Sequence, residues 1–226
     1  MTVRERRNKI LRIMKKLLRK YGRKEPPAGD TLLDRILLYL LYYGGSATAA
    51  RRVLKAFRED YVDLNEVRVA GLAELGTLFE ECGVSPTVAL LVKRFFRQIF
   101  ADRGNFNLDF LQDASSEQLR KYLVRTESLP THAVSYVIAS SRGALALPVE
   151  ENTLRTAKRL ALVERNSDLT RGEQILRRAV PKKKYLDFYF LLLEHSRKVC
   201  LTEPLCTRCV LISECESPRA KAAAKC

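Results

Sequence analysis

The sequence predicts an all-α protein, because apolar residues recur at helical spacing along the chain and no segment alternates as a strand would. Hydrophobic residues make up 46% of the 226 residues, which suffices for a buried core in one large domain or two small lobes. No apolar run is long enough to cross a bilayer, and the charged start at Met1–Arg7 leads into no signal-peptide core. We therefore expect a monomeric helical protein, cytoplasmic or nucleoid-associated, with no membrane partner.

In the first half of the chain, capping and breaking signals separate the predicted helices. The first helix ends at the helix-breaking stretch Lys24–Gly29, after which Asp30 or Thr31 can cap the second. The second helix is apolar on nearly all sides, as is typical of a central buried helix. Helices are predicted at 3–22, 31–43 and 47–58, as a pair over 63–81, and at 86–101.

The second half of the chain continues the helical pattern. Leu108, Phe110 and Leu111 predict a short apolar turn, and Ser115–Glu117 can cap a helix that runs to about residue 125. Further helices are predicted at 130–141, 149–163, 170–180 and 186–199. The tail beyond Pro218, rich in Lys and Ala, is expected to fray.

The strong positive charge points to a polyanionic partner. The chain has 41 Lys and Arg against 26 Asp and Glu, which gives a net charge of +15 and a pI near 9.8. Nucleic acid is the usual polyanion, although a solvated basic surface is the simpler alternative. We expect Lys93, Arg94 and Arg97 on the outward face of their helix. Basic residues that can meet phosphate are Arg51, Arg52, Lys93, Arg94, Arg97, Arg155, Lys158, Arg159 and Lys182–Lys184.

Four cysteines near the C-terminus predict a metal centre. Cys200, Cys206, Cys209 and Cys215 have the spacing C-x5-C-x2-C-x5-C. In a cytosolic chain such a group is a set of soft metal ligands rather than of disulfides. A zinc site usually has two C-x2-C pairs, whereas one pair with wider flanking spans suits a four-iron cluster, whose iron corners each take one cysteine. The spacing favours the cluster and leaves zinc open.

These cysteines complete a pattern that resembles a known family. Pro148–Glu150 leads into Arg155 and Arg159, and Leu191–Arg197 precedes the cysteines. With the order of helices from about residue 30 to Cys215, this resembles endonuclease III and the adenine glycosylases, of the helix-hairpin-helix DNA glycosylase superfamily. The family's cysteine spacing, C-x6-C-x2-C-x5-C, is one residue longer in its first loop. The resemblance implies that the metal centre is a [4Fe-4S] cluster.

The resemblance also implies an architecture of two helical lobes. A six-helix lobe would span residues 30–143. Residues 1–29 and 144–226 would form a cluster lobe around the loop at 200–215. DNA, double-stranded and damaged, would lie in a cleft between the two lobes.

The DNA-binding hairpin of the family is altered in this chain. Its motif, Leu-Pro-Gly-Val-Gly-x-Lys, matches Thr126–His132 without a gap. The glycines of the motif let backbone amides approach a DNA phosphate, and Ser128 and Pro130 replace them here. Because proline donates no amide, we expect a weaker grip on DNA by Ser128, Leu129 and Thr131.

Two catalytic positions of the family also differ. The lysine that forms a Schiff base aligns with His132, expected as a surface residue at a helix start, and an imidazole cannot form that iminium. The catalytic aspartate aligns with Glu150, whose carboxylate would stabilise an oxocarbenium-like sugar or activate a water. Glutamate is one methylene longer, and a displacement near 1 Å can cost about a hundredfold in rate.

Other functional positions of the family fall on residues that differ in how well they could fill the same roles. The glutamine that fills the gap left by a flipped base falls at Tyr42–Gly45. Gly44 cannot fill that gap, and Tyr43 could stack on DNA, although tyrosines at a helix end more often pack in a core. As basic residues, Arg155 and Arg159 are expected to contact DNA. His195, five residues before the first cysteine, is expected in a structural role because four cysteines already suffice as ligands.

The departures from the family pattern all concern the expected catalytic and DNA-binding site. They leave three functions open. We favour a DNA-binding iron–sulfur protein of base-excision-repair type, similar to endonuclease III, that lacks AP-lyase activity and has weak or lost glycosylase activity. The first alternative is an active monofunctional DNA glycosylase that uses Glu150 to remove a damaged base. The second alternative is a zinc-binding helical adaptor without a nucleic-acid role.

Overall fold

The structure of the protein is a computed structural model that describes residues 1–23, 29–126, 128–143 and 146–217. Most of the predicted break at Lys24–Gly29 and the tail from Pro218 onward lie outside the described residues. The all-α prediction is confirmed, since the described residues form helices, turns and loops, with no strand among them. None of the helices in this described part is long and apolar enough to cross a membrane.

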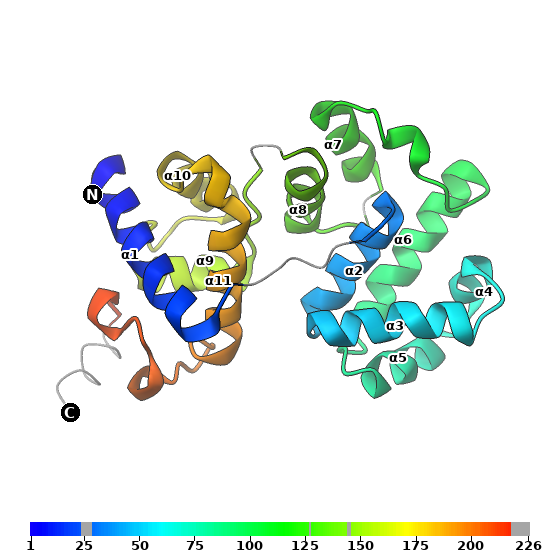
Figure 1. The fold of residues 1–226 in the computed structure, drawn as a ribbon, viewed down its shortest axis with the longest axis horizontal. Coiled ribbons are helices and arrows are strands. Elements are labelled where there is room, and N and C mark those ends of the chain that lie inside the picture. The colour runs from blue at the N-terminus through cyan, green and yellow to red at the C-terminus, as the bar shows by residue number, and fades with distance from the viewer. Residues whose placement is uncertain (24–28, 127, 144–145, 218–226) are drawn as a thin grey trace. The chain divides into compact units, whose positions relative to one another are not determined.

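The chain divides into two units. Unit 2 is continuous, Glu25–Ala144, whereas unit 1 combines Met1–Lys24 with Leu145–Cys226. Within unit 1, helix α1 (Val3–Tyr21) and helix α11 (Tyr185–Lys198) lie side by side, in blue and orange in Figure 1. Unit 1 therefore depends on contacts between segments that are far apart in the sequence.

Unit 2 is built around α2. Its helices are α2 (Leu32–Gly44), α3 (Ala47–Glu59), α4 (Leu64–Val69), α5 (Leu72–Glu81), α6 (Val88–Arg103), α7 (Ser116–Arg125) and α8 (Thr131–Arg142), with the 3-10 turn η1 (Asp109–Leu111). Helix α2 packs against α3, α6 and α8, and its residues from Ile36 to Tyr42 are all buried. This confirms the prediction of a central buried helix. With the short α4, of 6 residues, the described residues of this unit form one α-helix more than the resemblance implies.

Side-chain caps start the helices of unit 2 where the sequence predicts. Thr31 Oγ1 accepts the backbone N–H of Asp34 at 3.0 Å. Ser46 and Ser115 cap α3 and α7 in the same way. Each cap satisfies a backbone N–H that has no partner within its helix, which typically contributes about 1 kcal/mol.

The prediction for Lys93 is wrong, because its side chain is buried, whereas Arg94 and Arg97 are exposed as predicted. The Lys93 ammonium donates hydrogen bonds to the carbonyl oxygens of Arg68, at 3.2 Å, and of Ala70. These carbonyls lie at the end of α4, where the last carbonyl groups lack partners within the helix. The partners are 25 and 23 residues away in the sequence, so helical periodicity alone could not show this role.

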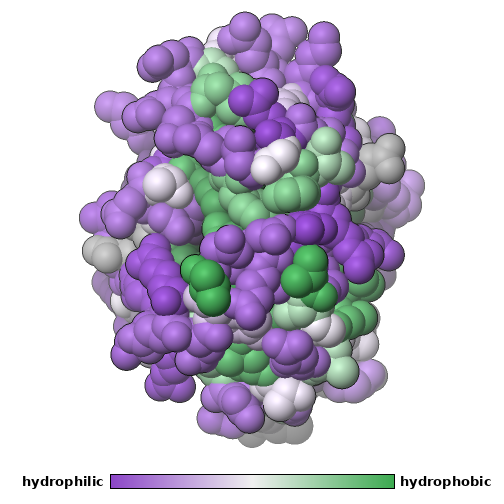
Figure 2. All heavy atoms as spheres, turned by 90° about the vertical axis from the view of Figure 1, so that its right-hand side faces the viewer, coloured by the Kyte–Doolittle hydropathy of each residue, from purple (hydrophilic) through white to green (hydrophobic). Residues whose placement is uncertain are grey.

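The face formed by the helices at the right of Figure 1 is turned to the viewer in Figure 2. It is mainly hydrophilic, with smaller hydrophobic areas among the polar residues. Val62, which precedes α4, and Val69, the last residue of α4, are 93% and 60% exposed. Separate exposed hydrophobic residues are ordinary on folded proteins, so they do not by themselves indicate an interface.

Unit 1 is built around α11. Its other helices are α1, α9 (Glu151–Arg159) and α10 (Leu169–Ala179), with the 3-10 turns η2 (Lys182–Lys184), η3 (Cys206–Arg208) and η4 (Ile212–Glu214). Helix α11 packs against both α1 and α9, and its residues from Phe188 to Leu193 are buried. Helix α1 contributes Ile10, Ile13 and Leu17 to the core, at the spacing that predicts this helix.

Helix α9 is shorter than predicted and ends at Arg159. Two backbone hydrogen bonds close this end, from Leu162 N–H to Ala157 O at 2.8 Å and from Ala161 N–H to Lys158 O at 3.0 Å. Ala161 takes the left-handed conformation, with φ 52°, that such a helix end requires. Glycine is the usual residue there, so an alanine gives no sequence signal that the helix stops.

Candidate functional site

The turn between α7 and α8 is where the resemblance places the DNA-binding hairpin. Pro130 is the N-cap of α8, so the helix begins one residue after the predicted start. Ser128 and Leu129 before it are buried, with 7% and 8% exposed, while Thr131 is exposed. Glu127 lies outside the described residues. Of the three residues predicted to contact DNA at this turn, the structure presents Thr131 on the surface, and contact with DNA stays a prediction.

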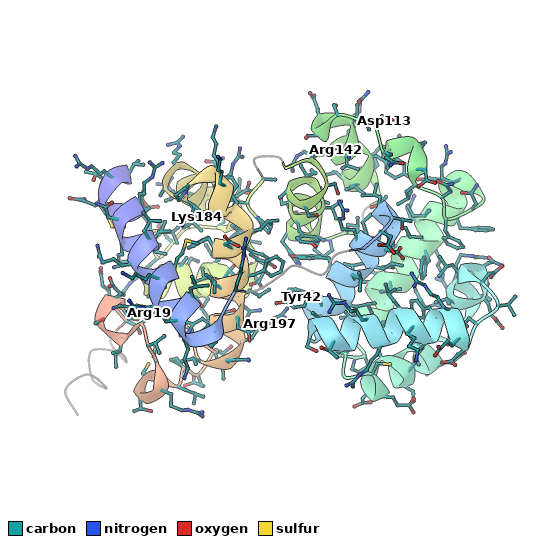
Figure 3. All side chains as sticks on the ribbon, in the orientation of Figure 1. Arg19, Tyr42, Asp113, Arg142, Lys184 and Arg197 are labelled. Carbon is teal, nitrogen blue, oxygen red and sulfur yellow. The ribbon has the colours of Figure 1, made fainter. Side chains whose placement is uncertain are left out.

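Helix α8, which follows this turn, is anchored at its far end. Figure 3 marks Arg142 there, whose guanidinium donates to the carbonyl oxygens of Leu111 and of Ala114, the latter at 3.0 Å. Arg35 of α2 donates to the carbonyl oxygen of Ser140 at 3.3 Å. These bonds fix α8, and with it the position of the residues in its first turn.

His132 is buried, which corrects the expectation of a surface histidine. Its ring centroid lies 4.7 Å from that of Tyr43 and 5.9 Å from that of Tyr39. Tyr39 in turn stacks on Tyr136 at 4.1 Å. Aromatic contacts at such distances are favourable beyond the area that they bury. The residue that the resemblance aligns with the family's lysine therefore lies within a cluster of aromatic rings from α2 and α8.

The end of α2, where the resemblance places the family's glutamine, has no room for a side chain at Gly44 or Gly45. A Cβ atom at Gly44 would lie 2.4 Å from Val88 Cγ2, and one at Gly45 would lie 2.7 Å from Gly83 O. Non-bonded carbon atoms pack about 3.5–4.0 Å apart, so a side chain at either position would clash. Tyr42 beside them is 7% exposed, as expected for a tyrosine that packs in the core.

Glu150 caps the N-terminus of α9 with its own carboxylate. Oε1 accepts the backbone N–H of Thr153 at 2.7 Å, and Oε2 accepts the backbone N–H of Asn152 at 2.9 Å and its side-chain Nδ2 at 3.0 Å. The side chain is buried, with 2% exposed. A helix N-terminus carries partial positive charge, so this position stabilises a carboxylate and holds it in one place.

A chain of hydrogen bonds connects Glu150 with the cysteine loop. Asn152, which donates to Glu150, accepts a hydrogen bond at Oδ1 from Arg155 at 2.8 Å. The other end of the Arg155 guanidinium donates to the carbonyl oxygen of Cys200 at 3.1 Å. Sequence reasoning missed this chain, because the contact between Arg155 and Cys200 joins residues 45 positions apart.

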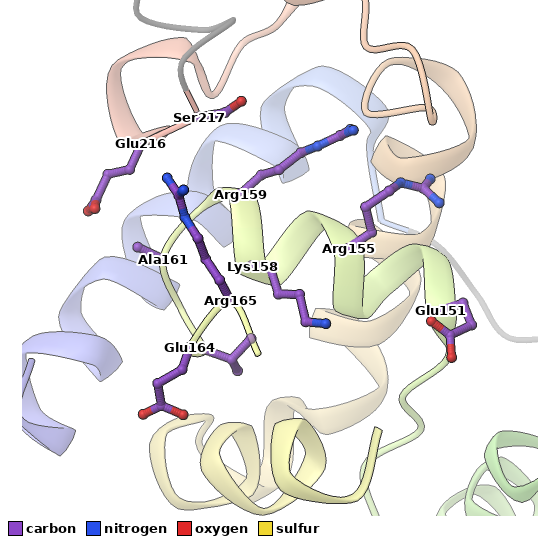
Figure 4. A pocket seen from close by; sticks show the side chains of 10 residues that line it. Glu151, Arg155, Lys158, Arg159, Ala161, Glu164, Arg165, Glu216 and Ser217 are labelled. Carbon is purple, nitrogen blue, oxygen red and sulfur yellow. The ribbon is translucent and has the colours of Figure 1, made fainter. Parts of the chain in front are cut away.

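Arg159 binds the same loop one turn further along α9. Its guanidinium donates to the Cys200 sulfur at 3.4 Å and to the carbonyl oxygen of Thr202 at 2.8 Å. In Figure 4 the side chains of Arg155 and Arg159 leave α9 on one side and that of Lys158 on the other. We predicted both arginines on a DNA-binding side. The structure places their guanidinium groups on the cysteine loop, and contact with DNA stays a prediction for them.

A pocket of about 620 Å³ lies beside α9 and is shown in Figure 4. Among the residues that line it, Lys158 and Arg165 form no ion pair with a described residue. Glu164 and Glu216 are each paired with a basic residue outside the pocket. Arg155 and Arg159 also line the pocket, so its four basic residues outnumber Glu151, the lining carboxylate left without an ion pair to a described residue. This excess of positive charge extends the set of candidate phosphate contacts to Arg165.

The four cysteines line one cavity, Cys200, Cys206, Cys209 and Cys215 alike, and all are free thiols. Burial and the proximity of the other three cysteines raise the pKa of Cys209 to about 11. Thiolates gathered in this way repel one another, so this donor set fits a centre whose metal charge stabilises them. Within the described residues, no three Cys, His, Asp or Glu side chains are grouped closely enough to hold a single metal ion.

His195 lies between α1 and the cysteines. Its Nδ1 is 2.9 Å from the Tyr21 hydroxyl and its Nε2 is 3.5 Å from the Cys209 sulfur. Burial lowers the pKa of His195 to about 4, so the ring is neutral near pH 7 and carries a single N–H. One ring nitrogen therefore donates and the other accepts, so the ring contacts the Tyr21 hydroxyl and the Cys209 sulfur at the same time. His195 thus contacts the cysteine loop on the side that faces α1.

Known proteins with similar sequences match different lengths of this chain. No family model matches the chain. The transcriptional activator DEMETER of Arabidopsis thaliana is 28% identical over 104 residues, which are 46% of this chain but only 5% of that protein. A protein of Methanocaldococcus jannaschii, provisionally named as a DNA repair glycosylase, is 22% identical over 212 residues, 92% of this chain and 96% of that protein. The chain therefore spans a small part of the plant relative and nearly all of the archaeal one.

Solved structures show the fold. A non-covalent complex of endonuclease III with DNA matches with a TM-score of 0.70 at 16% identity, over 100% of both chains. The chain has the endonuclease III fold. A thermostable thymine-DNA glycosylase matches with a TM-score of 0.65 at 18% identity, over 98% of both chains. The resemblance read from the sequence is confirmed at the level of the endonuclease III fold.

Proposed function

We propose that this protein is a monofunctional DNA glycosylase of endonuclease III type, which removes a damaged base and leaves the DNA backbone intact. The observation that carries the proposal is the carboxylate of Glu150, held at the start of α9 by two backbone N–H groups and by Asn152. A group fixed in this way needs little reorganisation during a reaction. Relatives that are named DNA glycosylases support the same reading.

The chemistry of base removal suits a fixed carboxylate. As the bond between base and sugar breaks, the sugar gains oxocarbenium-like positive charge. Glu150 would stabilise that charge or activate the attacking water. Asn152 and Arg155 would keep the carboxylate in position, since each is held by hydrogen bonds to its neighbours. This arrangement is the reason to favour active base removal over the weak or lost activity expected from the sequence.

The lyase step would require an amine, and the position where the resemblance places that amine holds a histidine in this chain. A Schiff base forms between a lysine and the sugar, and the lysine position of the family holds His132. The imidazole packs against Tyr43 and Tyr39 and forms no iminium. Treatment with borohydride during turnover should therefore trap no covalent adduct between protein and DNA. A trapped adduct on a duplex with an abasic site would contradict this part of the proposal.

Binding to DNA would rest on charge. The net charge of +15 attracts a polyanion, and the exposed Arg51, Arg52, Arg94 and Arg97 can meet phosphates. Binding through such contacts releases counterions. The affinity should therefore fall steeply as the salt concentration rises.

The four cysteines would hold a [4Fe-4S] cluster, one at each iron corner. Their spacing and their shared cavity support this proposal, and a bound cluster would cross-link the loop at four points. Arg159 and His195 would donate hydrogen bonds to two of the sulfurs. Iron and sulfide in a brown protein are the expected result. Stoichiometric zinc in their place would favour the adaptor alternative.

A second candidate function is DNA binding without base removal. It is favoured by the occupied carboxylate, since both oxygens of Glu150 already accept hydrogen bonds and the side chain is one methylene longer than aspartate. Duplexes that each carry a single damaged base separate the two candidates. Release of a base, lost in Glu150→Gln while DNA affinity stays unchanged, supports the enzyme. Binding to the same duplexes without release from any of them supports the second candidate.

A further inference from the structure

One face of α1 carries three basic residues that reach the end of the cysteine loop. Lys9, Arg12 and Lys16 are spaced by three and four residues, so they share a face of the helix. Their partners all lie in residues 213–216, around the fourth cysteine. The core residues of α1, by contrast, pack against α10 and α11.

Glu214 is the centre of these contacts. It accepts two hydrogen bonds from the Arg12 guanidinium, at 3.3 and 3.4 Å, and one from the Lys16 ammonium at 3.1 Å. Lys16 also donates to Ser213 Oγ at 2.7 Å. The side chain of Glu214 is only 11% exposed, so it does not fluctuate freely in water as a surface carboxylate would. Lys9 pairs with Glu216 at 3.0 Å.

Cys215 lies between these two glutamates and is held from the opposite side by α9. The Cys215 thiol is 3.4 Å from the carbonyl oxygen of Arg159, and the N–H of Glu216 donates to that same oxygen at 3.0 Å. The cysteine is thus fixed between α1 and the end of α9. Helix α1 reaches a second cysteine through Tyr21, which contacts His195 and through it Cys209.

We propose that α1 is a clamp for the metal centre, in which Arg12 and Lys16 hold Glu214 and thereby keep Cys215 in place as the fourth ligand. The inference rests on the proposed cluster but adds to it, because it assigns positioning residues that lie about 200 residues away from the cysteine that they serve. A four-cysteine spacing alone does not predict that the N-terminal helix controls how firmly the cluster is kept. The clamp makes retention of the cluster depend on α1.

The test is the rate at which the purified protein loses its cluster to an iron chelator, followed by visible absorbance. We expect Arg12→Ala/Lys16→Ala to lose it about fivefold faster than the unmodified protein, since two partly exposed ion pairs together contribute about 1 kcal/mol and 1.4 kcal/mol corresponds to tenfold. The matched control is Lys15→Ala/Arg19→Ala, which removes two exposed positive charges from α1 that form no ion pair with a described residue. Figure 3 marks Arg19. The control should match the unmodified protein.

A charge exchange separates positioning from general stability. Glu214→Lys should speed the loss, and Lys16→Glu added to it should restore a slow rate, because the pair is re-formed with reversed charges. Thermal unfolding of the same variants shows whether a change is global. In the cluster-free protein, amide hydrogen exchange of residues 211–217 should be faster in Arg12→Ala/Lys16→Ala than in the control.

The outcomes distinguish this inference from the proposed function. Iron in the unmodified protein, with loss rates and exchange equal in the clamp variant and in its control, would overturn the clamp and leave the cluster standing. An unmodified protein that holds no iron would overturn the proposed cluster, and the clamp with it. Failure of the charge exchange to slow the loss would also count against the clamp.

Discussion

Replacing Arg155 by methionine tests whether the hydrogen-bond chain from Glu150 to the cysteine loop supports the site. Methionine keeps most of the apolar stem of the arginine but removes the guanidinium. The change therefore breaks the bond to Asn152 Oδ1 at 2.8 Å and the bond to Cys200 O at 3.1 Å. It leaves the cap that Glu150 makes on α9 in place.

The expected magnitude follows from these two bonds. A hydrogen bond from a charged donor typically contributes about 1.5–3 kcal/mol. The side chain of Arg155 is half-buried, and Cys200 O keeps a second, longer bond from Arg159 at 3.4 Å. Two such bonds would sum to about 3–6 kcal/mol, and these two features reduce the expected loss in the free energy of unfolding to about 2–3 kcal/mol. For a chain of this size that corresponds to a fall in Tm of roughly 4–12 °C.

Base release should fall as well, because Asn152 would no longer be fixed against Glu150. A misplacement near 1 Å can cost about a hundredfold, so we expect a decrease of roughly tenfold to a hundredfold in single-turnover rate. The assays are thermal unfolding and release of a damaged base under single-turnover conditions. Lys158→Met is the matched control, since Lys158 is also half-buried on α9 and forms no ion pair with a described residue. Because Lys158 is itself a candidate phosphate contact, the two variants are compared at equal DNA occupancy. Equal effects of the two substitutions on both measurements would refute the reasoning.

Three further predictions concern the backbone, the packing of α2 and the contact with DNA. Ala161→Gly should raise the free energy of unfolding by about 1 kcal/mol in denaturant titrations, because glycine adopts the left-handed helix end without steric cost. Gly44→Ala should lower it by about 1–3 kcal/mol through overpacking, whereas Gly76→Ala, with 3.5 Å to its nearest neighbour, should be neutral or stabilising. Arg94→Ala/Arg97→Ala should reduce the slope of log affinity against log salt concentration by about 2, and an unchanged slope would exclude both arginines as phosphate contacts.

Features set by local contacts could be predicted from the sequence. The caps at Thr31, Ser46 and Ser115 each join a side chain to a backbone N–H three residues away, so both partners are visible in a short stretch. The buried helix α2 follows from apolar residues on all its sides. The cysteine loop is equally local, because its four thiols fall between Cys200 and Cys215.

Features set by distant contacts could not be predicted. Lys9, Arg12 and Lys16 look like solvated positive charges in the sequence, yet their partners lie 207, 202 and 198 residues away. Lys93 follows the same rule, since it looks outward by helical spacing but meets carbonyl oxygens from another helix. Arg155 could be marked as basic, but its link to Cys200 appears only when α9 meets the cysteine loop.

Glu150 combines one feature that could be predicted from the sequence with one that could not. Its place after Pro148 and Val149 marks it as the counterpart of a catalytic carboxylate, and its role as the cap of α9 emerges only in the structure. Aspartate is a preferred capping residue. Glu150→Asp should therefore keep α9 intact while it shortens the side chain. Measured beside Glu150→Gln, it separates the loss of the charge from a change in side-chain length.

The central claim is that Glu150 removes a damaged base from DNA. It is tested most directly by single-turnover base release from duplexes that each carry one damaged base, with unmodified protein, Glu150→Asp and Glu150→Gln compared at equal DNA occupancy. We predict release of at least one base by the unmodified protein, retention of that activity in Glu150→Asp, and a loss of about a hundredfold or more in Glu150→Gln. Release by Glu150→Gln at the rate of the unmodified protein would contradict the claim.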